Sequence, residues 1–123
     1  MQLLISRSQI LDNLCRQVDS FFSCSYEERS VLDAYLDRAL ERVEICFQSI
    51  DNKYFKNEFG GVKFNPFHSV QYMTFLYLIA NELYHNRETS RLSDKLYYLN
   101  KAAAAELIIE SENNFLISCC RTD

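Results

Sequence analysis

Residues 67–85, FHSVQYMTFLYLIANELYH, decide the fold, because nearly every side of the helix that they would form carries apolar groups. Such a helix is stable only when other elements contact it on several sides. We therefore predict a central third helix over these residues, surrounded by the rest of the chain. Its apolar side chains are Val70, Tyr72, Met73, Phe75, Leu76, Tyr77, Leu78, Ile79, Ala80, Leu83 and Tyr84.

The segments before this stretch have the pattern of amphipathic helices. Apolar residues recur at three- and four-residue spacing over 9–22 and again over about 27–50, which predicts two helices that each turn one apolar stripe inward. Ser8 and Ser25 are expected to cap their first turns, because a serine hydroxyl accepts a hydrogen bond from an otherwise unpaired amide.

The connection over residues 51–66 breaks the helical pattern and is rich in aromatic residues. Asp51-Asn52 and Gly60-Gly61 favour turns, and Pro66 ends any helix that runs into it. A short hairpin around the glycine pair fits this stretch. The loop is expected to pack on the helices, because its five large apolar side chains would not all stay in water. These side chains are Tyr54, Phe55, Phe59, Val62 and Phe64.

A fourth helix is predicted from about Ser90. Its pattern is expected to continue over residues 107–109, whereas the apolar tail at 115–120 is too short to assign. Two glycines and one proline in 123 residues are too few turn formers for a sandwich or a barrel. We expect one all-α domain over residues 1–123, with a four-helix bundle-like fold and an aromatic-rich loop between the second and third helices.

Charge and hydropathy argue against two classes of partner. Thirteen basic and seventeen acidic side chains give a net charge of −4, and the bases are scattered among acids, as at Asp37-Arg38 and Glu41-Arg42. A nucleic-acid binder instead gathers its bases on one face. No apolar run approaches the roughly 20 residues of a membrane span. No basic region precedes the first apolar residues, so we expect neither a membrane partner nor a signal peptide.

The cysteines indicate a reducing compartment. The five of them, at positions 15, 24, 46, 119 and 120, are odd in number and lack CxxC spacing. This pattern favours neither a disulfide framework nor a zinc site. Cys15 and Cys46 stand at apolar positions of the helical pattern and are expected to be small buried hydrophobic residues. We therefore expect a cytoplasmic protein.

His68 and Gln71 are the candidate substrate-binding pair. They lie one turn apart on one face at the start of the predicted third helix, where they could bind a polar ligand or tie down the preceding loop. A capping role for His68 is the simpler interpretation. His85, at the other end of that helix, suits the helix dipole when protonated. No third metal ligand stands at a suitable spacing near either histidine.

No group of residues has the pattern of a catalytic site. A hydrolase needs a nucleophile, a base and an orienting group, but Ser69 and His68 are neighbours on a helix and point about 100° apart. Neither GxSxG nor a phosphate-binding glycine motif occurs. Asp33 and Asp37 are predicted on a solvated face, which suits surface charges better than acid–base chemistry. We expect no catalytic residue, no metal and no cofactor in this chain.

Two stretches resemble the helical N-terminal part of serine O-acetyltransferase-like proteins, above all the bacterial ones found with surface-polysaccharide genes. The first is ALERVEICF at 39–47 with IDNKYF at 50–55, and the second is FNPFHSVQY at 64–72, which continues to DKLYYLNK at 94–101. His68-x-x-Gln71 falls where serine acetyltransferases carry a His-x-x-Gln element at the start of a helix.

The resemblance implies acetyl-CoA-dependent transfer to a serine-like hydroxyl in the full-length family. A C-terminal left-handed β-helix of hexapeptide repeats carries the catalytic histidine and its carboxylate partner there, between subunits of a trimer. The 123 residues contain no such repeats. Asp51, the carboxylate nearest to the family's Asp-Pro-Ala-like substrate motif, is followed by Asn52-Lys53 instead. Only the helical domain's role in scaffolding and subunit association transfers to this chain.

Two functions are favoured by the sequence, ahead of a third, a small enzyme that uses His68 and a carboxylate. One is an oligomerisation domain of the acetyltransferase-like kind, without catalysis of its own. The other is a free-standing helical protein-interaction module, such as an adaptor or immunity-type protein. Under either function we expect self-association or a protein partner, because 14% of the residues are aromatic and a monomer would leave apolar surface uncovered.

Overall fold

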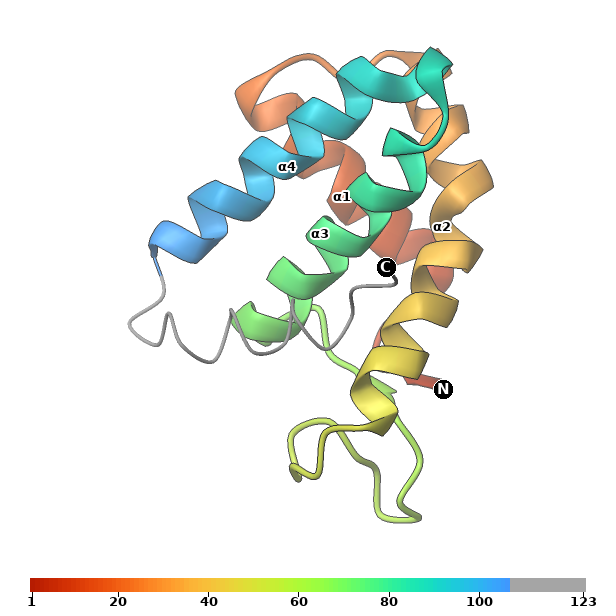
Figure 1. Ribbon diagram of the computed structural model, residues 1–123, viewed down its shortest axis with the longest axis vertical. Helices are drawn as coiled ribbons and strands as arrows, with labels where there is room; N and C mark the ends of the chain where they lie inside the picture. Colours follow the sequence, from red (N-terminus) through yellow and green to blue (C-terminus); the bar gives the residue numbers. More distant parts are fainter. Residues whose placement is uncertain (107–123) are drawn as a thin grey trace.

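Helices make up most of the chain, which confirms the all-α, four-helix prediction. The computed structural model describes residues 1–106, except for the side chain of residue 88. Helix α3 lies between α2 and α4 in Figure 1, and α1 crosses behind them. No helix in this part of the chain is long and apolar enough to cross a membrane. The elements are α1 (Arg7–Phe21), α2 (Tyr26–Gln48), α3 (Ser69–Tyr84) and α4 (Ser90–Ala105), with a 3₁₀ turn η1 (Arg87–Thr89) and the two-residue strands β1 (Gln2–Leu3) and β2 (Lys63–Phe64).

The first two helices each begin at a serine with a capping box. At α2 the predicted cap is confirmed: Ser25 Oγ accepts a hydrogen bond from the Glu28 amide at 3.1 Å, and the Glu28 carboxylate accepts one from the Ser25 amide at 3.2 Å. At α1 the cap is Ser6, and the prediction of Ser8 is wrong. A capping box needs a glutamate or glutamine at the third helical position. Gln9 stands there after Ser6, whereas an apolar residue would stand there after Ser8.

Helix α3 is the most buried helix, as its sequence predicts. The Phe75 side chain is 0% exposed, and α3 packs against both α2 and α4. Two buried hydrogen bonds fasten α4 to it. Ser93 Oγ donates to the Ala80 carbonyl and Asn100 Nδ2 donates to the Met73 carbonyl, both at 2.8 Å. Because each bond ends on a main-chain oxygen of α3, the two bonds fix the position of α4 along α3.

Helix α4 begins at Ser90, as predicted, and ends at Ala105. The predicted continuation over residues 107–109 and the apolar tail at 115–120 lie outside the described residues. The linker before α4 contains the short turn η1, whose Thr89 hydroxyl donates to the Leu83 carbonyl at 2.7 Å. This bond closes the end of α3 against the start of α4.

The aromatic-rich loop packs on the helices, as predicted, through only some of its apolar side chains. Lys56 and Val62 form an antiparallel bridge, the remnant of the predicted hairpin. Gly60 between them has a φ of +82°, which glycine adopts without strain. Tyr54 and Phe59 stand in turns and are 54% and 88% exposed. The buried side chains of the loop are Phe55, Val62 and Phe64.

Both ends of this loop are anchored by contacts that the sequence pattern does not predict. Strand β2 pairs in parallel with β1, which places Gln2 opposite Lys63 at the N-terminus of the chain. Lys56 Nζ donates to the carbonyls of Phe47 and Gln48 at 3.1 and 3.0 Å. The ammonium group thereby caps the carbonyl end of α2, where a cation is favourable.

Replacing Phe75 with alanine tests whether α3 is central. We expect Phe75→Ala to lower the free energy of unfolding by about 3–5 kcal/mol, because it leaves a cavity where the ring packed on Phe64. Phe59→Ala is the control, and it should change stability by less than about 0.5 kcal/mol because Phe59 is exposed. Urea unfolding followed by circular dichroism measures both. Equal, small losses would place α3 at the periphery and contradict this architecture.

Candidate functional site

His68 forms the N-cap of α3. Its Nδ1 accepts a hydrogen bond from the Gln71 amide at 3.4 Å. Its ring packs between two aromatic side chains, with centroids 5.7 Å from Tyr54 and 5.7 Å from Phe55. This is the capping role that the sequence offers as the simpler interpretation, and it joins the start of α3 to the preceding loop.

Gln71 ties the same loop down from inside the protein. Its side chain is fully buried, its Oε1 accepts the Asn65 amide proton at 2.7 Å, and its Nε2 donates to the Tyr54 carbonyl at 2.8 Å. The structure therefore brings the candidate pair together, but both ends of Gln71 are already bonded to main chain. A ligand could reach neither polar atom without breaking the loop away from α3.

The carboxylates of α2 serve to hold helices together. Arg7 of α1 binds both Asp33 and Asp37, with Nη1 to Asp33 Oδ1 at 2.6 Å and Nε to Asp37 Oδ1 at 2.8 Å. The hydrogen bonds to Asp37 and then Asp33 raise the pKa of this guanidinium. Lys95 of α4 pairs with Glu28 at 2.7 Å. Across residues 1–106, no group of three or more histidine, cysteine or acidic side chains is placed to hold a metal ion.

Cys15 and Cys24 are adjacent thiols beside a shallow hollow of about 320 Å³. Burial raises the pKa of Cys15 to about 11, helped by the neighbouring Cys24, which shares a hydrogen bond with it. Burial also raises the pKa of Cys24. A thiol must be deprotonated to act as a nucleophile, so this pair is poorly suited to nucleophilic catalysis near neutral pH.

Cys46 corrects the sequence interpretation of the cysteines. It is buried, as expected, but it is disulfide-bonded. The predicted burial of Cys46 is confirmed, whereas the cysteine pattern gives no sign of its disulfide. An odd number of cysteines does not prevent a single pairing, and the cysteine content no longer argues for a reducing compartment.

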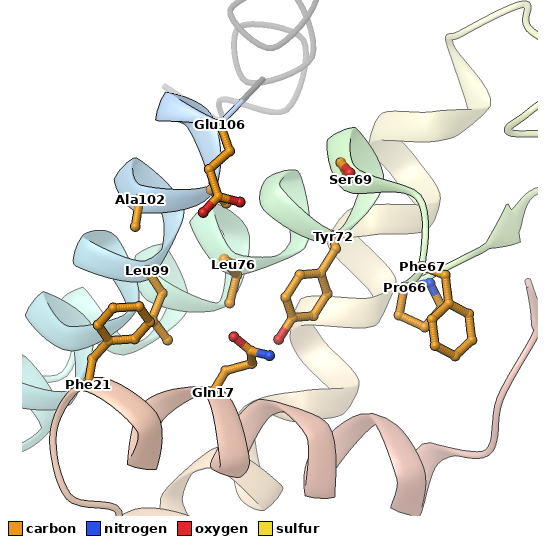
Figure 2. Close-up of a pocket in the computed structure, with 11 residues that line it drawn as sticks. Gln17, Phe21, Pro66, Phe67, Ser69, Tyr72, Leu76, Leu99, Ala102 and Glu106 are labelled. Atoms are coloured by element: carbon orange, nitrogen blue, oxygen red, sulfur yellow. The ribbon is translucent and has the colours of Figure 1, made fainter. Parts of the chain in front are cut away.

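A cleft of about 380 Å³ opens between α1, α3 and α4 (Figure 2). Figure 2 shows the Tyr72 ring reaching from α3 towards α1. The Tyr72 hydroxyl is buried and has no hydrogen-bond partner among the described residues, and burial raises the pKa of this phenol. The cleft mixes apolar and polar groups, among them Phe21, Leu76, Leu99, Gln17, Tyr72 and Glu106.

Exposed aromatic rings gather beside the cleft. Phe21 and Phe22 at the end of α1 meet Tyr98 of α4 edge to face, with centroids 5.6 and 5.3 Å from it. Phe21 lines the cleft together with Phe67, which is 78% exposed. Phe21, Phe22, Phe67 and Tyr98 are called the aromatic face below.

Sequence reasoning missed both features. Phe21, Phe22 and Tyr72 were expected in apolar stripes that face the core, where each has the same spacing as its buried neighbours. The cleft draws on three segments that are far apart in the chain, so no local pattern marks it. An unbalanced excess of aromatic residues is the one sequence signal that points to an exposed aromatic surface.

Loss of the Gln71 side chain should loosen the loop. We expect Gln71→Ala to lower the free energy of unfolding by about 1–3 kcal/mol, because it leaves part-buried main-chain groups of Asn65 and Tyr54 without their Gln71 partner. Limited proteolysis should also cut residues 51–66 faster. Gln48→Ala at the exposed end of α2 is the matched control. If both variants keep the stability and the cleavage rate of the original protein, the hydrogen bonds of Gln71 do not hold the loop in place.

The rate of Cys15 alkylation should rise with pH well beyond the range of an ordinary thiol. Only the thiolate reacts, and the pKa of Cys15 lies near 11, so the rate should still climb between pH 9 and pH 10. Iodoacetamide labelling followed by peptide mass spectrometry measures it, with the urea-unfolded chain as control. A folded-state rate that levels off by pH 9 would contradict the assigned environment.

The chain matches no protein family, no curated protein and no solved structure in the comparisons with known proteins. The resemblance to the helical part of serine O-acetyltransferase-like proteins therefore stays an expectation from the sequence. The aromatic face and the cleft beside it are the features from which a function can be argued.

Proposed function

We propose that this chain is a helical association domain that joins polypeptide chains through its aromatic face and carries no catalysis of its own. This is the role that the resemblance to the N-terminal part of serine O-acetyltransferase-like proteins implies, where such a domain would hold subunits together. The observation that carries the proposal is the set of exposed rings in and beside one cleft, which lies between α1, α3 and α4.

The exposure of these rings supports an interface. Phe21, Phe22, Phe67 and Tyr98 are 54, 41, 78 and 50% exposed. Aromatic side chains of this size are a common source of binding energy when a partner covers them. Scattered exposed apolar residues need no explanation, but Phe21 and Phe22 both contact Tyr98, and Phe21 also lines the cleft with Phe67. Residues that contribute most to binding energy cluster near the centre of an interface, as Phe21, Phe22 and Tyr98 do here.

The exposed charged residues of α2 differ in chemistry from this face. The outer side of α2 carries Asp33, Asp37, Arg38 and Glu41, and Arg7 bridges the first two. Charged side chains are depleted at the centres of interfaces and enriched in solvated surfaces. This contrast supports an interface at the aromatic face, with the charged residues of α2 left in solvent.

The second function, a free-standing interaction module, would use the same face for an unrelated protein. The polar groups in the cleft favour it as a candidate, because Tyr72 and Gln17 offer hydrogen bonds that a purely apolar interface would leave unmade. The two functions differ in whether the partner is a second copy of this chain.

Sedimentation velocity tests self-association directly. We expect a concentration-dependent species heavier than the 14.5 kDa monomer at micromolar concentration. Phe21→Ser combined with Tyr98→Ser should return the chain to a monomer, because it removes rings from the centre of the face. Ile45→Ser combined with Phe59→Ser is the matched control, since it removes exposed apolar side chains elsewhere. Circular dichroism should show both variants folded.

A single monomeric species that is unchanged over a tenfold range of concentration would rule out self-association. Association that survives in the Phe21→Ser, Tyr98→Ser variant would place the interface on another surface. Either result contradicts the proposal as stated, and the first leaves the free-standing module as the function to pursue.

A further inference from the structure

The inner wall of the cleft holds a polar atom that the fold does not use. The Tyr72 hydroxyl has less than 1 Å² of accessible surface and no hydrogen-bond partner among the described residues. An unpaired buried hydroxyl costs the protein about 1–3 kcal/mol. Figure 2 shows Gln17 as the labelled side chain beside it, on α1. Gln17 is exposed, so it can move aside when a ligand enters.

The α4 end of the cleft is negative. Glu106 is the C-cap of α4 and lines the cleft, and the last turn of this helix contains no basic residue. The C-terminal end of a helix carries a partial negative charge, so an added carboxylate there is unfavourable unless a cation lies close by. Glu106 forms no ion pair within residues 1–106. None of the described residues that line the cleft carries a positive charge.

Between these polar groups the walls are apolar and aromatic. Leu76 and Leu99 line the cleft, and the exposed rings of Phe21 and Phe67 stand at its opposite ends (Figure 2). Such walls suit a methylene chain, and the aromatic rings can attract a cation that passes over them. The cleft is thus built for a long apolar stem with a positive head that donates several hydrogen bonds.

We propose that the cleft binds an arginine side chain of the partner protein. The guanidinium would donate to the Glu106 carboxylate and the Tyr72 hydroxyl, and its methylene stem would lie against Leu76 and Leu99. Arginine suits the site because its planar head has five donors and does not lose its charge. This inference rests on the proposed function for the partner being a protein, and it names the side chain that the partner presents.

Titration with small probes tests the cleft apart from any association. The probe is N-acetyl-arginine amide, and the matched control probe is N-acetyl-citrulline amide, which has the same shape without the charge. We expect the arginine probe to shift the backbone amide NMR signals of Gln17, Ser69 and Glu106. The citrulline probe should bind about tenfold more weakly, because a hydrogen bond to a charged partner contributes more than a neutral one.

Two variants separate binding from folding. Glu106→Gln should weaken the arginine probe about tenfold, while Glu58→Gln in the loop should leave it unchanged. Tyr72→Phe should weaken the probe severalfold without lowering the free energy of unfolding, because the hydroxyl has no partner to lose. A Tyr72 hydroxyl with a merely structural role would instead lower stability and leave probe binding intact.

Equal affinity for the arginine and citrulline probes, or no effect of Glu106→Gln, would overturn the proposal. Sedimentation of Glu106→Gln keeps the two proposals apart. Probe binding without self-association contradicts only the association proposal. Self-association without probe binding contradicts only the proposal that the cleft binds arginine.

Discussion

Helix α3 has almost no polar side of its own, so it is stable only while α2, α4 and the aromatic-rich loop cover it. That requirement determines how the other elements are attached. The covering elements bond to main-chain oxygens at or near α3: Ser93 and Asn100 of α4 reach the carbonyls of Ala80 and Met73. The register of α4 on α3 then determines where the end of α4 lies, and hence where the cleft opens.

The ion pairs follow a pattern that explains why one side of the molecule is aromatic. Among the described residues, ion pairs join α2 to each of the other three helices, through Arg7, Arg29, Arg42 and Lys95, and none joins α1 to α4. Charges therefore gather where α2 meets its neighbours. The α1–α4 side is left to the rings of the aromatic face, which suits a surface that another molecule covers.

The sequence predicts the helices well because their signals are local. The all-round apolar pattern identifies α3, and Ser25 with Glu28 three residues later marks the start of α2. The N-terminal strand could not be foreseen, because two residues carry no pattern and their partner Lys63 lies far along the chain. The cap of α1 is Ser6 and not the predicted Ser8, because a serine identifies a cap only together with the residue at the third helical position.

Only local contacts of the candidate residues could be predicted from the sequence. His68 and Gln71 are one turn apart, so their joint role at the start of α3 was visible as one of two alternatives. The cleft depends on Gln17, Tyr72 and Glu106, which come from three helical segments. Their convergence is a result of helix packing, and a residue such as Tyr72 has the same apolar signature in sequence whether its hydroxyl is bonded or not.

The Gln71 clamp has a consequence for how the protein tolerates change. The Gln71 side chain binds the loop only through main-chain atoms, the amide of Asn65 and the carbonyl of Tyr54. Every amino acid except proline offers the same two groups, so the clamp does not depend on which side chains the loop displays. Outward-facing positions such as Phe59 are thus free to diverge between relatives, or to accept a grafted recognition sequence, while the scaffold beneath them keeps its shape.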